Sequence, residues 1–164
     1  MRKYLLLAML AVGLQASVTA QLKSGSVEPP NRIELPNTVY ILDSAQLYKK
    51  PAVFHVDQND CYLQISGDYA VMSYQFRGKQ VFFSGTIHNS KMIEIDGKPV
   101  KSFTVITDNK YGTSDSGKRM FIGISEEASQ TLVYELDNVR VPGVIFTSHI
   151  ATAQELKALK EQSE

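Results

Sequence analysis

Two tight turns, at Gly67-Asp68 and at Arg77-Gly78, divide residues 61–88 into three short segments rich in alternating apolar and polar residues. Two-residue loops that contain glycine are typical of β-hairpins, and each such loop fixes which residues of its two strands lie opposite one another. Counted independently, both loops place the apolar side chains on one face, with the pairs Cys61 and Tyr74, Leu63 and Met72, Ile65 and Ala70, Met72 and Phe83, and Tyr74 and Val81. The sequence therefore predicts a three-stranded antiparallel meander.

The opposite face of this meander is mostly polar, and it carries Val71, Ser73, Gln75, Gln80, Phe82, Ser84, Thr86 and His88. A shift of one residue at either turn would move a whole apolar row into water, so the agreement of the two registers is stronger evidence than β-propensity alone. We expect Phe83 to be buried opposite Met72 and Phe82 to lie on a solvated face.

Short β-branched and aromatic segments, separated by turn residues and without helical patterns between them, continue on both sides of the meander. This pattern is typical of a sandwich or a barrel. We therefore predict an all-β fold, a single antiparallel sandwich or barrel-like domain built on the meander, with a short C-terminal helix. The further strands are expected at residues 38–42, 53–56, 91–95, 100–106, 120–125, 131–136 and 139–146.

One predicted hairpin has an ambiguous register. Asp96-Gly97 is the strongest short hairpin signal in the chain, and it pairs Ile93 with Val100. The same register leaves Phe103 on the opposite face from Val100. Either both faces of this hairpin are covered, or Pro99 marks a bulge.

The last residues, 151–164, form the only convincing helical pattern. Thr152 and Glu155 have the spacing of a capping box, and Leu156 and Leu159 lie on one side of the predicted helix. Because so short a helix is marginal in water, it would need those leucines to dock.

Residues 1–20 have the features of a secretory signal peptide. Arg2 and Lys3 precede an apolar run of about 11 residues, and Val18-Thr19-Ala20 is a small-residue cleavage site. The run is shorter than the roughly 20 residues that span a bilayer, and we expect no membrane span. No cysteine follows the cleavage site, so a lipoprotein is not expected. We predict a periplasmic or secreted protein that begins at Gln21.

The mature chain is expected to have a Pro-rich flexible linker at residues 21–37 and one β domain at residues 38–150. Loss of Arg2 and Lys3 changes the net charge of zero to about −2, which gives no basis for binding nucleic acid. Cys61 is the only cysteine, so no intramolecular disulfide can form, and the register points Cys61 inward.

Three patterns resemble functional motifs only in part. Residues 112–118 have P-loop spacing, but Arg119 stands where a magnesium-binding hydroxyl belongs and a strand follows instead of a helix. Residues 57–60 begin like a calcium loop that lacks its later ligands. His55, His88 and His149 have no metal-ligand spacing. We therefore assign no catalytic residue, no metal and no cofactor.

The best functional hypothesis is an exported, non-enzymatic binding or assembly factor of the bacterial envelope, with a protein or cell-wall partner. Two alternatives stay open: an enzyme or enzyme inhibitor that acts on the cell wall, and a polymerising or strand-adding subunit of a surface or secretion assembly. The loop of residues 109–119 is the longest polar interruption between strands, and such loops often carry function. Within it, Tyr111, Lys118 and Arg119 are the candidate binding residues.

Overall fold

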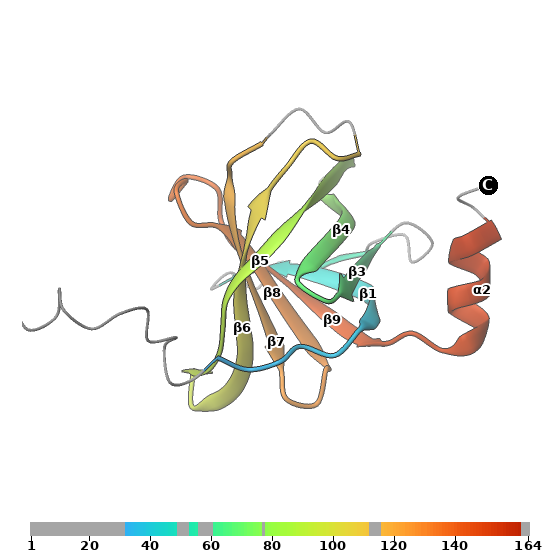
Figure 1. Cartoon of the computed structure of the whole chain (residues 1–164), viewed down its shortest axis with the longest axis horizontal. Coiled ribbons are helices and arrows are strands. Elements are labelled where there is room, and N and C mark those ends of the chain that lie inside the picture. The colour runs from blue at the N-terminus through green and yellow to red at the C-terminus, as the bar shows by residue number, and fades with distance from the viewer. Residues whose placement is uncertain (1–31, 49–52, 56–60, 77, 112–115, 162–164) are drawn as a thin grey trace, which may run out of the picture. The chain divides into compact units, whose positions relative to one another are not determined.

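The computed structural model describes residues 32–48, 53–55, 61–76, 78–111 and 116–161 (Figure 1). Two units can be distinguished in the chain, Met1–Arg32 and Ile33–Glu164, and the fold below is that of the second. The predicted signal peptide lies outside the described residues, as does most of the predicted linker, so both stay predictions.

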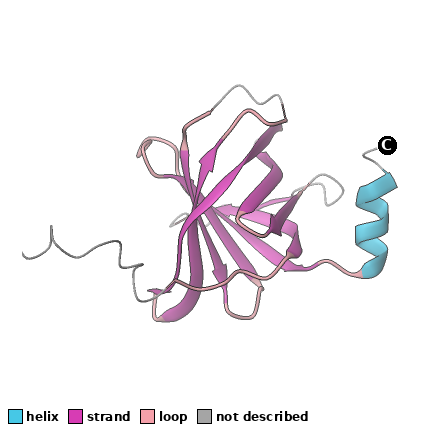
Figure 2. Cartoon of the chain, viewed as in Figure 1, coloured by secondary structure: helices cyan, strands magenta, loops and turns pink. Residues whose placement is uncertain are grey.

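Strands make up most of the second unit, and one short helix ends its described part (Figure 2). The strands are β1 (Thr38–Leu47), β2 (Val53–His55), β3 (Tyr62–Ser66), β4 (Tyr69–Phe76), β5 (Lys79–Ile95), β6 (Lys98–Thr107), β7 (Arg119–Ser125), β8 (Gln130–Glu135) and β9 (Val144–Ile150), and the helix is α2 (Ala153–Glu161).

Eight of the strands in the described part of the chain close into an antiparallel barrel. Each strand from β3 to β9 pairs with its neighbour in sequence, and β1 pairs with both β3 and β9. The short strand β2 extends the edge of β1 beyond β3. Closure decides between the two predicted architectures, so the all-β prediction is confirmed in its barrel form.

The predicted meander has the expected registers. Met72 lies opposite both Leu63 and Phe83, and the turns fall at Gly67-Asp68 and at residues 77–78. Cys61 is fully buried, in agreement with its predicted inward position. Met72 is buried completely and Phe83 is 6% exposed, so both belong to the barrel core.

The hairpin at Asp96-Gly97 pairs Ile93 with Val100, and both turn residues have positive φ angles of 50° and 76°, as a tight hairpin turn of mirror-image type requires. Val100 and Phe103 are both buried, which agrees with the alternative that both faces of this hairpin are covered. The other alternative, a bulge at Pro99, is wrong, because Pro99 pairs regularly with Glu94. The register shift lies instead in β5, between His88 and Lys91, where Asn89 has a φ of 55°. This irregularity joins two segments that the sequence presents separately into one strand of 17 residues.

The outer wall of the barrel is less solvated than the sequence pattern indicates. Ser84 is fully buried and Ser73 is 7% exposed, although both lie on the predicted polar face. Ser84 is covered because the chain after β6 folds back, and the Asp108 amide donates to the Ser84 carbonyl oxygen. The expectation of a solvated outer face therefore fails at these two serines.

One end of the barrel is closed by the segment before β1, which crosses that end in Figure 1. The Ile33 amide donates to the carbonyl oxygen of Ser90, and the Ser90 hydroxyl donates to the carbonyl oxygen of Ile33. Between these bonds and β1, Leu35 packs against the core. This end is therefore plugged by an apolar side chain.

Helix α2 begins with the predicted capping box. The Glu155 amide donates to the Thr152 hydroxyl oxygen at 3.3 Å, and the Glu155 carboxylate accepts from the Thr152 amide and hydroxyl. The expected docking of leucines is not what holds the helix, because none of its residues is buried. It is tied to the barrel by the polar side chain of His149.

Candidate functional site

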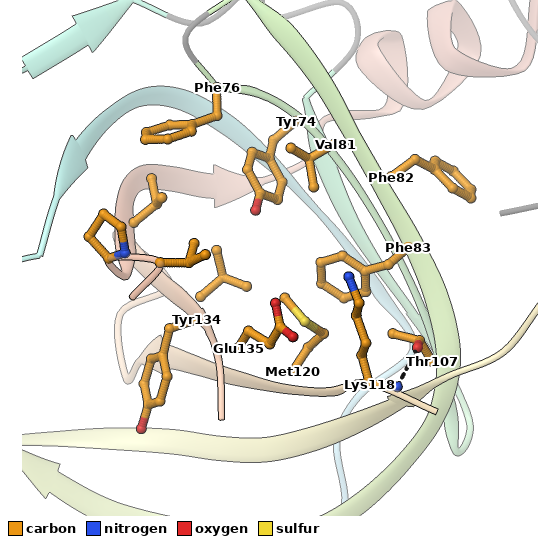
Figure 3. A pocket seen from close by; sticks show the side chains of 14 residues that line it. Tyr74, Phe76, Val81, Phe82, Phe83, Thr107, Lys118, Met120, Tyr134 and Glu135 are labelled. Atoms are coloured by element: carbon orange, nitrogen blue, oxygen red, sulfur yellow. Dashed lines mark hydrogen bonds between the residues drawn. The ribbon is translucent and has the colours of Figure 1, made fainter. Parts of the chain in front are cut away.

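The end of the barrel opposite the Leu35 plug holds a cavity of about 190 Å³ (Figure 3). Its deep wall consists of buried side chains from four different strands: Phe83, Met120, Val133 and Val144. Its rim adds Phe76, Val81, Val141 and Pro142. The cavity is therefore a mainly apolar recess that opens at the mouth of the barrel.

The strand period explains why these side chains meet. Residues two apart in a strand point to the same face, so the inward row of β7 continues from Met120 to Lys118 at the rim. Glu135 lies opposite Met120 in the pairing of β7 with β8, and its side chain therefore also points inward. The mouth thus carries one cationic and one anionic group above an apolar floor.

Tyr74 supplies a third polar group, deeper than the two charges. Its ring contacts Phe146 edge to face at a centroid distance of 5.1 Å. In Figure 3 its hydroxyl points into the cavity, and the Glu135 carboxylate points into the same space from β8. Burial and, second, the negative charge of Glu135 raise the pKa of Tyr74 to about 12. The hydroxyl therefore stays protonated over the whole physiological pH range.

The three candidate binding residues of the loop after β6 lie in three different environments. Lys118 lines the cavity, and its amide donates to the Thr107 hydroxyl oxygen at 3.0 Å. Tyr111 lies outside the barrel wall, and its ring is 6.3 Å from that of Phe82. Arg119 forms an ion pair with Asp137, with Nε 2.9 Å from a carboxylate oxygen. Binding by these residues stays a prediction.

Asp108 holds the start of this loop against the outer wall. Its carboxylate accepts hydrogen bonds from the Tyr69 hydroxyl at 2.8 Å and the Ser84 hydroxyl at 3.2 Å. A third bond comes from the Lys110 amide, and this bond contributes most to lowering the pKa of the Asp108 carboxyl. The Lys110 ammonium lies 4.7 Å from the centroid of the Tyr69 ring. The aromatic side chain of Tyr111 is thereby fixed on the outside, away from the cavity.

The two histidines whose side chains the structure describes do not converge. His88 is exposed on the outer wall, the side chain of His55 is not described, and His149 lies beside helix α2. His149 binds Asp43 through Nδ1 at 2.9 Å and Glu155 through Nε2 at 3.0 Å. Asp43 reaches this position because it is the extra residue of a bulge in β1. Among the described residues, no group of three or more His, Cys, Asp and Glu side chains could hold a metal ion.

Sequence reasoning missed most of the cavity, because its residues come from six strands and are separated by up to 70 positions. The one available signal was the inward row of the meander, which contains Tyr74 and Phe83. The residues that complete the site, Glu135 and Met120, carry no local motif.

Comparison with known proteins adds no relationship. No protein-family model matches the chain, and no curated protein is significantly similar to it in sequence. No helix in the described ranges is both long and apolar enough to cross a membrane.

Proposed function

We propose that the protein is an exported, non-enzymatic binding protein that holds one small, largely apolar molecule in the mouth of its barrel. The observation that carries this proposal is the cavity of about 190 Å³, which is open at one end of a barrel whose other end is plugged. Export is proposed from the leader-like residues 1–20, and a bacterial envelope or secreted location follows from it.

The size of the cavity supports a ligand of about eight non-hydrogen atoms, because a cavity of about 150 Å³ holds benzene in another protein. Barrels of eight strands are just wide enough to be filled by side chains or to hold one small ligand. The apolar floor of Phe83, Met120 and Val133 would supply most of the binding free energy by removing ligand surface from water.

The closed barrel also bears on the strand-adding alternative. Addition of a strand needs an unpaired sheet edge, and the pairing of β1 with β9 removes such an edge from the eight barrel strands. This geometry favours binding within the barrel over binding along its edge.

Toluene is a suitable first probe, because its seven carbon atoms fit the cavity. We expect NMR titration of the purified protein to show binding with a Kd of about 1 mM or tighter, with the largest shifts at the mouth. A Val81→Trp variant should abolish binding, since the larger ring fills the mouth.

The matched control is His88→Trp, which places the same side chain on the same strand at an exposed position. It should bind toluene as the wild type does. Absence of toluene binding to the wild type, or equal loss in both variants, would refute the proposal.

A further inference from the structure

Tyr74 combines a deeply buried ring with a hydroxyl that faces the cavity. Its side chain is more than nine-tenths buried, and among the residues that the structure describes no protein group forms a hydrogen bond with the hydroxyl. No buried side-chain oxygen or nitrogen atom of the described residues lacks a partner, so this hydroxyl is open to the cavity and not sealed from water. A tyrosine in a protein interior usually finds a partner for its hydroxyl. Because the Tyr74 hydroxyl faces the cavity in Figure 3, the missing partner would have to lie inside the cavity.

Glu135 faces the same space, and its carboxylate has no hydrogen bond or ion pair with a described residue. Its charge reaches Tyr74, since it is one of the two causes of the raised tyrosine pKa. The cavity therefore presents the Tyr74 hydroxyl as a donor and the Glu135 carboxylate as an acceptor to anything that enters it.

The two groups together restrict the polar part of a ligand. A carboxylate beside Glu135 would be repelled by it and could not donate to it, and an ammonium group could not accept the hydrogen bond that the Tyr74 hydroxyl donates. A pure hydrocarbon would leave the Tyr74 hydroxyl unpaired. A neutral hydroxyl satisfies both groups, because it accepts one hydrogen bond and donates another.

We propose that the cavity selects a neutral molecule with a small apolar body and one hydroxyl group, which accepts a hydrogen bond from Tyr74 and donates one to Glu135. This inference rests on the proposed function and names the ligand class of the same cavity. The apolar body would lie against Phe83 and Met120, below the two polar groups.

Phenol and toluene test this inference, since they have the same shape and number of non-hydrogen atoms and differ in the hydroxyl. We expect Tyr74→Phe to weaken phenol binding about fivefold and to leave toluene binding unchanged, because one net hydrogen bond is lost only with phenol. Glu135→Leu should show the same selectivity. The matched control is Tyr134→Phe, since the Tyr134 hydroxyl points away from the cavity in Figure 3, and it should change neither affinity.

The melting temperature of Tyr74→Phe gives an independent readout. Removal of a hydroxyl that has no protein partner should leave Tm unchanged or raise it, whereas a marked fall would show that the hydroxyl has a protein partner and would overturn the inference. Equal effects of Tyr74→Phe on both probes, or no effect on either, would also overturn it. If toluene binds and phenol does not, the ligand class is wrong while the proposed function stands. If neither probe binds, both fail.

Discussion

At Gly85 the backbone of β6 lies so close to β5 that it leaves no room for a side chain, and replacement of this glycine by alanine tests the barrel geometry directly. A Cβ atom at this position would lie 2.7 Å from the carbonyl carbon of Ile106 and 2.9 Å from the Cα atom of Thr107, and nearer still to the Ile106 carbonyl oxygen. All three are backbone atoms of the paired strand, so no side chain can rotate to relieve the contact. A glycine in a strand often marks such an approach.

The size of the effect follows from the displacement that is needed. The β6 backbone would have to move by about 1 Å relative to β5, in a ladder whose strands are normally about 4.8 Å apart. We expect Gly85→Ala to lower the free energy of unfolding by about 3 kcal/mol or more, out of a total of about 5–15 kcal/mol. The corresponding fall in Tm is about 10 °C.

Gly123 provides the matched control, because it is another strand glycine whose nearest neighbours are side-chain atoms. Its added Cβ would lie 3.0 Å from Val100 Cγ1 and 3.2 Å from Phe121 Cε1, and both groups can shift by a few tenths of an ångström. Gly123→Ala should cost about 1 kcal/mol or less. Urea denaturation of both variants gives the comparison. Equal losses, or a loss below about 1 kcal/mol for Gly85→Ala, would refute the close approach of β5 and β6.

Three further predictions use other parts of the chain. Phe83→Ala should lower the free energy of unfolding by about 3–5 kcal/mol, whereas Phe82→Ala, on the outer wall, should cost less than half as much by the same urea titration. The attachment of helix α2 should depend on pH, because hydrogen bonds to Asp43 and Glu155 raise the pKa of His149 above 6.5. The stabilisation that protonated His149 gives to this attachment is therefore complete below pH 6.5 and is lost as the pH rises through the raised pKa. The pKa of Glu155 is lowered from 4.5 to about 2, chiefly by hydrogen bonds from the Thr152 backbone and side chain. The stabilisation that ionised Glu155 gives to the start of the helix is therefore present above pH 4.5 and is lost toward pH 2. Amide exchange of α2 should therefore be slowest between pH 4.5 and 6.5 after correction for the intrinsic rate. If a His149→Gln variant still loses amide protection in α2 as the pH rises, His149 is not the cause of the pH dependence. Mass analysis of exported protein should give Gln21 as the first residue, and a chain that retains Met1 in the exported fraction would count against the signal peptide.

The parts of the fold that sequence predicted are those fixed by local geometry. A two-residue turn and a side-chain period of two together determine the partner of each residue in β3, β4 and the first half of β5. The irregularity at Asn89 and Ser90 escaped prediction because it depends on Ile33, a residue more than 50 positions away. Barrel closure escaped it for the same reason: Ser44 and Thr147 are hydrogen-bonded through their hydroxyls at a separation of 103 residues.

The candidate site was less accessible to prediction than the fold. The loop of residues 109–119 was singled out for its polar composition, yet only Lys118 among its candidate residues lines the cavity. From the sequence, Tyr74 is predicted only as an inward position of the meander, and Glu135 only falls within the strand expected at residues 131–136. Their significance depends on the cavity that they share in three dimensions, which no sequence pattern records.

The pairing of β1 with β9 has a consequence for how the chain reaches its folded state. The other adjacent barrel strands are close in sequence, because a hairpin or a short connection joins them. The pairing of β1 with β9 instead joins residues near 44 to residues near 147, so a loop of about 100 residues must close before it forms. The β1 strand is synthesised early, and its pairing with β9 cannot form until the last strand of the barrel has been synthesised. Until then both β1 and β8 present unpaired edges, and these edges are the surfaces of a partly folded chain that are most prone to aggregation.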